Sequence, residues 1–116
     1  MNLGYLLIIL IGAHFLADFP LQGDYLAKAK NRHGGGISGT PWWIALGGHA
    51  FIHGAVVTLI TGFWILGLCE ILLHILIDDL KCAQKISYIQ DQLLHIACKI
   101  IYAFITLYLT AGTILI

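Results

Sequence analysis

Four long apolar stretches alternate with short polar segments along the chain. They cover residues 3–19, 41–60, 63–81 and 92–115. A helix that crosses a bilayer needs about 20 mostly apolar residues, so each stretch is long enough, or nearly so, to be a membrane span. Pro41 suits the first turn of the second helix, and Gly62 suits its end. The pattern therefore predicts a single all-α domain over residues 1–116, an integral membrane four-helix bundle.

The basic residues indicate how this bundle is oriented. Lys28, Lys30 and Arg32 lie in the segment 20–40, and Lys81 and Lys85 lie between the third and fourth stretches. Four antiparallel spans put both segments on one side, which the positive-inside rule makes cytoplasmic. Both termini then face outward, and the expected location is the cytoplasmic (inner) membrane. The first stretch has no basic residue before it and no cleavage-site pattern, so we expect a retained span rather than a signal peptide.

Composition narrows the class of protein. Apolar residues make up 59% of the 116 residues and charged residues only 10%, whereas a soluble domain has about 25% charged residues. Six basic residues balance six acidic ones, so no polyanionic partner is indicated. These values exclude a soluble globular domain and a nucleic-acid-binding module. The lipid bilayer is the expected partner, and the small size favours a homo-oligomer.

Ionisable residues recur four positions apart inside each apolar stretch, so those on one stretch share a helix face. Such residues are costly in a bilayer and mark functional sites. In chain order they are His14 and Asp18; His49 and His53; Glu70, His74 and Asp78; and Asp91, His95 and Lys99.

Depth below the cytoplasmic boundary sorts these residues into three layers, at a rise of 1.5 Å per residue. The three aspartates lie within roughly 5 Å of the boundary. One histidine from each helix lies roughly 7–12 Å deep, namely His14, His49, His74 and His95. The deepest layer, at roughly 13–18 Å, holds His53, Glu70 and Lys99. The layering predicts one cavity that opens to the cytoplasm.

A layer of histidines from four helices predicts a transition-metal site, because neutral imidazole binds zinc, iron, copper and nickel. Zinc is the first candidate. Carboxylates one turn away can bind the metal directly or accept the second ring N–H of a ligand histidine. One zinc takes four protein ligands, or three and a water, so the residues suffice for additional orienting groups or for two metals. The candidate ligands are His14, Asp18, His49, His53, His74, Asp78, Asp91 and His95.

Such a site suggests metal-assisted hydrolysis of a lipid or another membrane-embedded substrate. The metal would activate a water, and Asp18, Asp78 or Glu70 would accept its proton. We expect His74 and Asp78 at the centre, because the third stretch contributes to all three layers. Glu70 has a structural alternative, which is an ion pair with Lys99 or a hydrogen bond to His53.

Three other functions use the same residues. The Asp and His layers could be ion or proton stations of a small transporter or channel. Facing histidines could ligate haem, although the many carboxylates count against this. Hydrogen bonds between helices could be purely structural, but each stabilises a membrane protein by only ~0.6 kcal/mol on average, whereas inserting a charged Asp costs ~2.5–3.5 kcal/mol.

Four strings in this order resemble a known family of small bacterial and phage membrane proteins, catalogued as domain of unknown function 3307. The resemblance covers nearly the whole chain and supports the fold and the residue set, but it implies no reaction. Gln22, Lys28 and Gln92 lie in or beside these strings, so the resemblance implies that they border the same cavity. The strings are HFLADFPLQ from His14, HAFIHG from His49, Glu70 with HILID from His74 and Lys81, and DQLLH from Asp91.

Overall fold

The computed structural model describes the backbone of residues 2–114 and the side chains of residues 2–111. The described chain is all-α, as predicted, with no strand. Its elements are α1 (Leu3–Asp18), α2 (Gly23–Ala29), the short 3₁₀ helix η1 (Arg32–Gly34), α3 (Trp42–Thr61), α4 (Trp64–Cys82) and α5 (Tyr88–Ile114). Four of these helices match the four apolar stretches. Residue 115, which the fourth stretch includes, lies outside the described residues.

Local sequence signals account for most helix ends. The Asn2 side chain accepts a hydrogen bond from the Tyr5 amide at the start of α1. Gly62 ends α3 in the left-handed conformation, with φ of 79°, and donates its amide to the Thr58 carbonyl, as a C-terminal glycine does. The start of α5 was not expected. It lies four residues earlier than the apolar pattern predicts, because Ser87 and Gln90 cap each other's amides in a capping box.

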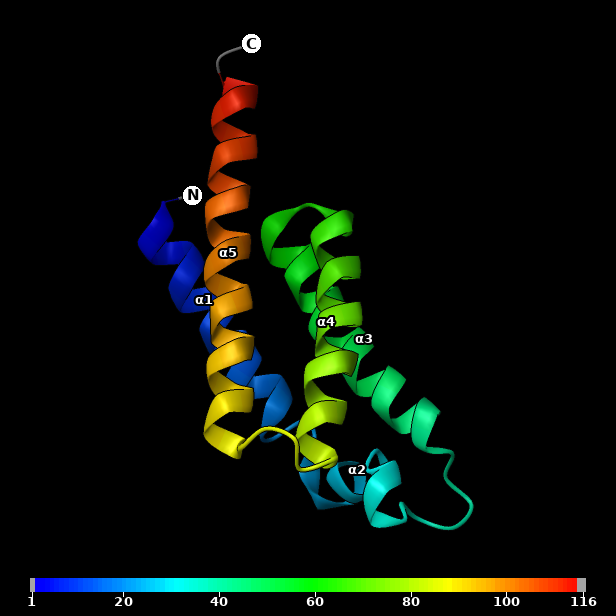
Figure 1. Cartoon of the computed structure of the whole chain (residues 1–116). Helices are drawn as coiled ribbons and strands as arrows, with labels where there is room; N and C mark the ends of the chain where they lie inside the picture. Colours follow the sequence, from blue (N-terminus) through cyan, green and yellow to red (C-terminus); the bar gives the residue numbers. More distant parts are fainter. Residues whose placement is uncertain (1, 115–116) are drawn as a thin grey trace.

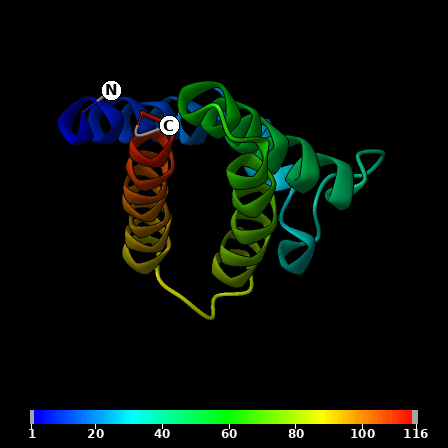
Figure 2. The same ribbon diagram turned by 90° about the horizontal axis from the view of Figure 1, so that it is seen from above.

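The four long helices run up and down and enclose a common interior. In Figure 1, α1 lies behind α5 and α3 lies behind α4, while α4 and α5 run side by side in both views (Figures 1 and 2). Each long helix contacts its two neighbours in this ring, and α3 with α4 is the most extensive pair. The two termini and the α3–α4 turn are at one end, and α2 with the α4–α5 connection is at the other. We call the latter the loop end.

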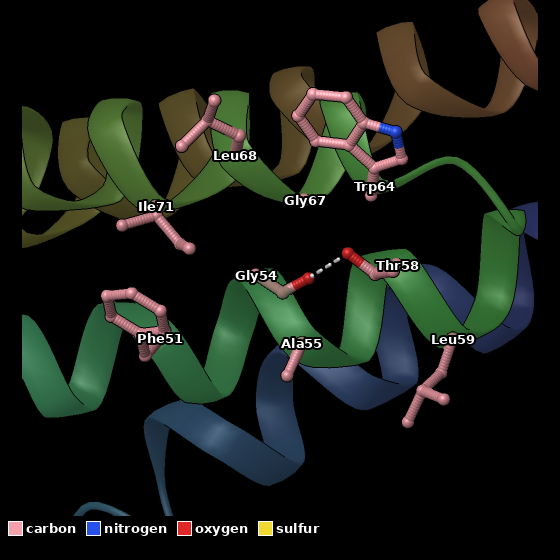
Figure 3. A pocket seen from close by; sticks show the side chains of 9 residues that line it. All are labelled: Phe51, Gly54, Ala55, Thr58, Leu59, Trp64, Gly67, Leu68 and Ile71. Atoms are coloured by element: carbon pink, nitrogen blue, oxygen red, sulfur yellow. Dashed lines mark hydrogen bonds between the residues drawn. The ribbon is translucent and has the colours of Figure 1, made fainter.

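The α3–α4 hairpin is close because glycines face each other where its helices cross. A Cβ atom on Gly54 would lie 2.6 Å from the Gly67 carbonyl oxygen, and one on Gly67 would lie 2.6 Å from the Gly54 carbonyl oxygen. This approach leaves an outward-facing groove of about 430 Å³. Its lining is mostly apolar and comes from both helices, with Phe51 and Trp64 among the side chains (Figure 3).

The described side chains are arranged inside out compared with a soluble protein. Large apolar side chains such as Ile8, Leu59, Trp64, Leu72 and Leu93 are more than 60% exposed on the outer faces of the long helices. Histidine, aspartate, glutamate and lysine side chains fill much of the interior. Burial in lipid explains both features, since lipid removes apolar side chains from water and leaves polar groups to find partners inside.

Taken one at a time, the described helices support fewer membrane spans than the four that the sequence predicts. Only α3 and α5, among the described helices, are long and apolar enough to cross a bilayer alone. Helix α1 has 16 residues, and it makes a third candidate only if it is joined with α2 across a bend of 80°. Helix α4 is long enough, with 19 residues, but it carries Glu70, Asp78, Asp79 and Lys81. Two spans are thus supported helix by helix, and four remain a proposal.

Candidate metal centre

The ten ionisable residues that recur four positions apart are all buried in the bundle, and contacts between their side chains join them into one cluster. The rings of five histidines are in contact. Those of His53 and His74 stack with centroids 3.9 Å apart, and those of His74 and His95 with centroids 4.2 Å apart. His14 lies beside His53 and His95, and His49 lies beside His53 and His74. His53 therefore belongs to the histidine layer, not to the deeper layer that helix rise alone predicts, because the helices are tilted.

Asp18 is the point on which three helices converge. Its Oδ1 atom lies 3.1 Å from His49 Nε2 and 3.0 Å from His53 Nε2, both on α3. The same oxygen lies 3.8 Å from His74 Nε2 on α4. Helix α1 ends at Asp18, since Pro20 cannot continue a helix. One buried carboxylate oxygen thus faces three imidazole nitrogens.

A chain of polar contacts orients His74. Its Nδ1 atom lies 3.3 Å from Glu70 Oε1, one turn away on α4. The Lys99 ammonium donates to the same Glu70 oxygen at 2.5 Å. A carboxylate beside Nδ1 favours a proton on that nitrogen, which leaves the Nε2 lone pair directed at the interior. His74 Nε2 and His49 Nδ1 are among the buried ring nitrogens with no hydrogen-bond partner in the described part of the chain.

On α5, Gln92 connects Asp91 with residues of α1. Its amide nitrogen donates to Asp18 Oδ2 at 2.9 Å and to Asp91 Oδ2 at 3.2 Å. Its amide oxygen lies 3.0 Å from His14 Nε2. The other Asp91 oxygen, Oδ1, lies 3.2 Å from His95 Nε2. Gln92 therefore borders the cluster and fixes the Asp18 carboxylate from the side opposite the α3 histidines.

Asp78 has a different environment from the one we expected for a central ligand. The buried Lys30 ammonium donates to its Oδ2 at 2.5 Å, and Lys81 lies 3.4 Å from its Oδ1. His49 Nε2 and His74 Nε2 lie 3.8 Å away. Lysines thus occupy the Asp78 carboxylate, and His49 Nε2 lies closer to Asp18 than to Asp78. That His74 and Asp78 form the centre stays a prediction.

The lysine of the segment 20–40 that reaches the cluster is Lys30, not Lys28. Lys28 is exposed on α2, so it does not line the buried cluster, contrary to the expectation. Lys30 directly follows α2 and turns inward, where it also donates to the side-chain oxygen of Gln22. Gln22 and Lys99 both contact residues of the cluster. The spacing of charges on a short surface helix did not indicate which lysine turns inward.

Outside the bundle, the segment after Lys30 is bound to α4. Arg32 donates to both oxygens of Asp79, at 3.1 and 2.8 Å, and His33 Nε2 lies 3.2 Å from Asp79 Oδ1. The hydrogen bonds to the Asp79 carboxylate raise the pKa of the Arg32 guanidinium above its usual value. Residues 30–33, which we call the latch, thus cover the loop end of the cluster.

Three groups of described residues place possible ligand atoms within 4.8 Å of one another. They are Asp18, His49, His53 and His74; Glu70, His74 and His95; and Asp18, Asp91 and His95. The first has three imidazoles and one carboxylate, a donor set that suits a tetrahedral zinc ion. Its buried His74 nitrogen without a hydrogen-bond partner fits a ligand atom. The buried His and Asp groups are thus compatible with metal binding.

Comparison with known proteins identifies a family for this chain but no activity. No curated protein and no solved structure matched the chain. A family model matches residues 6–115, which is nearly the whole chain, and its description states no activity. The chain belongs to the family described as "Protein of unknown function (DUF3307)".

Proposed function

We propose that the protein is a four-span protein of the cytoplasmic membrane that binds a transition metal ion. Zinc is the first candidate for this ion. The ligands are Asp18, His49, His53 and His74. The observation that carries this proposal is the single Asp18 oxygen, buried among three imidazole Nε2 atoms from α3 and α4 at 3.0–3.8 Å. A metal ion would replace the imidazole protons that these contacts otherwise require.

The charges in the interior support a metal over a purely structural network. Of the four carboxylates buried in the described part of the chain, Glu70 is paired with Lys99 and Asp78 with Lys30. Asp18 and Asp91 have only histidines as ion-pair partners among the described residues. A buried carboxylate without a cation is strongly destabilising, and a divalent cation supplies the missing charge.

The bundle supports a buried site in one half of its interior, not a continuous pore. The half of the interior away from the loop end is filled by an apolar cluster that includes Leu6, Leu10, Val57 and Leu66. Ions or protons would have to cross this cluster to pass through the protein. Stacked rings such as those of His53 and His74, 3.9 Å apart, leave no space between them for a haem.

We assign to this centre the metal-assisted hydrolysis of a lipid or another membrane-embedded substrate. A zinc ion held by the four proposed ligands would supply a hydroxide nucleophile at neutral pH if a water bound to it as a fifth ligand. Glu70 and Asp78 are held by lysines, so we assign them to positioning instead of proton transfer. Asp91 has a buried oxygen without a hydrogen-bond partner in the described part of the chain, so it is the carboxylate left free to take part in the centre.

The test is the metal content of protein purified in detergent, loaded with zinc and freed of excess metal. We expect at least one tightly bound ion per chain, and loss of the ion bound at Asp18 in Asp18→Asn and His74→Ala. His33→Ala is the matched control, because His33 lies outside the bundle on Asp79. Monodisperse wild-type protein that binds no transition metal would overturn the proposal.

A further inference from the structure

Asp18 belongs to two of the possible ligand groups, and its two oxygens face different helices. Oδ1 faces His49 and His53 on α3. Oδ2 accepts from Gln92 on α5 at 2.9 Å. The other group that contains Asp18 joins it to Asp91 and His95, both also on α5. A carboxylate between two sets of ligands is placed to bridge two metal ions.

The pair Asp91 and His95 also contains a buried candidate ligand atom that has no hydrogen-bond partner in the described part of the chain. Both residues are 1% exposed, and Asp91 Oδ1 lies 3.2 Å from His95 Nε2. In spite of this distance, Asp91 Oδ1 has no hydrogen-bond partner in the described part of the chain. A buried carboxylate oxygen without a donor is costly, whereas two ligands of one metal ion lie close together without a hydrogen bond between them.

We infer that the centre holds two divalent metal ions bridged by the Asp18 carboxylate, the second of them bound by Asp91 and His95. This inference rests on the proposed function, because the first ion is the one held by Asp18, His49, His53 and His74. Gln92, which donates to both Asp18 and Asp91, fixes the two carboxylates relative to each other. Glu70 is not a ligand of either ion, because Lys99 donates to it at 2.5 Å.

The charge of two metal ions also indicates which kind of molecule the centre would bind. Their four positive charges exceed those of the Asp18 and Asp91 carboxylates by two, since Glu70 and Asp78 are balanced by lysines. An anionic ligand would reduce this excess, and a single hydroxide, bound when no substrate is present, would lower it from two to one. Paired metal ions stabilise both the attacking and the leaving oxygen of a displacement, so this composition suits hydrolysis.

The experiment counts zinc ions per chain in detergent-purified protein by elemental analysis. The protein is saturated with zinc and then passed over a desalting column. We expect two ions in the wild type, one in Asp91→Asn, one in His95→Gln and two in the control His33→Ala. The two α5 variants check each other, so the result stands if either of them fails to elute as a monodisperse species.

The alternative outcomes separate this inference from the proposed function. A wild type with one ion, retained in both α5 variants, overturns the second site and leaves the first in place. Two ions in Asp91→Asn and in His95→Gln also overturn it, since the second ion would then lie elsewhere. No ion in these variants, with one in the wild type, would make Asp91 and His95 ligands of a single centre. A wild type without metal overturns both proposals.

Discussion

The four buried carboxylates differ in the partners that surround them. Glu70 and Asp78 each accept from a lysine ammonium at 2.5 Å, whereas Asp18 and Asp91 face histidines. An ammonium donor satisfies a carboxylate and lowers its capacity to bind a metal, while neutral imidazoles are themselves ligands. In the proposed centre, the partner of each carboxylate, more than its depth, therefore decides whether the carboxylate is assigned as a metal ligand or as a group that orients a ligand.

Glu70→Gln should weaken metal binding without abolishing it. The change removes the carboxylate that orients His74 through Nδ1, and loss of such an orienting group costs about 10–100-fold in metal affinity. Zinc affinity is measured by competition with a chelator. Because this substitution would leave the Lys99 ammonium unpaired, the comparison is made with Lys99→Met as well as with the double variant. Affinity unchanged in Glu70→Gln and in the double variant would show that Glu70 does not orient a ligand.

At this scale the sequence predicted which residues meet but not what each one contacts. Repeats of four put His14 and Asp18, or Glu70 and His74, on one face, and the structure does bring the two residues of each pair together. Helix tilt and rotation are not encoded in such spacing. They place His53 among the other histidines and make Asp18 the shared neighbour. Lys30 was missed because its direction depends on the end of a short helix in the loop.

Among the elements, the α3–α4 hairpin depends on glycine at its crossing. Gly54→Ala should destabilise the protein by about 1–3 kcal/mol, the range for overfilling a packed interior, because the new methyl group would lie 2.6 Å from the Gly67 carbonyl. Gly47→Ala, on the same helix, has nothing within 4 Å of the added atom and should not lower the melting temperature. Both are measured by thermal unfolding in detergent. Equal melting temperatures for the two variants would contradict the close crossing.

The latch is expected to depend on its buried ion pair and very little on its exposed one. Lys30→Met leaves the buried Asp78 with only Lys81 at 3.4 Å, and breaking a buried pair costs about 3–5 kcal/mol. The double variant Lys30→Met with Asp78→Leu should recover most of this loss, because the charge it leaves without its partner is that of Lys81, whose side chain is partly exposed to solvent. Arg32→Ala is the control, since its bond to Asp79 is solvent-exposed. Lys30→Met with the thermal stability of the wild type would show that the pair does not hold the latch.

Across the whole molecule, the apolar pattern predicted the four long helices well. How many of them can span a membrane depends on how they pack, because packing decides which charged residues face the interior. Helix α4 has too many charged residues to be a convincing span in isolation, yet Glu70 and Asp78 are buried in the bundle. Asp79 and Lys81 lie in its last turn, at the loop end. Charges that face the interior or the boundary do not have to be solvated by lipid. A test of single helices therefore underestimates the spans of a bundle with a polar interior.

The orientation of the bundle can be tested on the two ends separately. The loop end carries Lys28, Lys30, Arg32, Lys81 and Lys85, so the positive-inside rule predicts that it faces the cytoplasm. Lys28 is exposed on α2. Lys28→Cys therefore provides a single labelling site at the loop end, once Cys69, Cys82 and Cys98 are replaced by alanine. An impermeant thiol reagent should label it only in inside-out vesicles.

The opposite end is tested with an alkaline phosphatase, which is active only outside the cytoplasm, fused to the C-terminus. Helix α5 ends beyond the start of α1, at the end of the bundle away from the basic loops (Figure 1). Four spans require that this end face outward, so the fusion should be active, whereas phosphatase inserted at Gly35 in the loop should be inactive. If α4 alone failed to cross, α5 would return the chain to the cytoplasm and the C-terminal fusion would be inactive.

An active C-terminal fusion also fits an arrangement in which α1 and α5 cross and the α3–α4 hairpin lies on the cytoplasmic surface. The two arrangements differ in the position of Gly62, which ends α3 at the turn between these helices. A spanning hairpin brings this turn to the outer surface, because the turn lies at the end of the bundle opposite the basic loops. Gly62→Cys, in the chain without its natural cysteines, should therefore be labelled by an impermeant reagent on intact cells. Labelling only in inside-out vesicles would place the hairpin on the cytoplasmic surface and reduce the bundle to two spans.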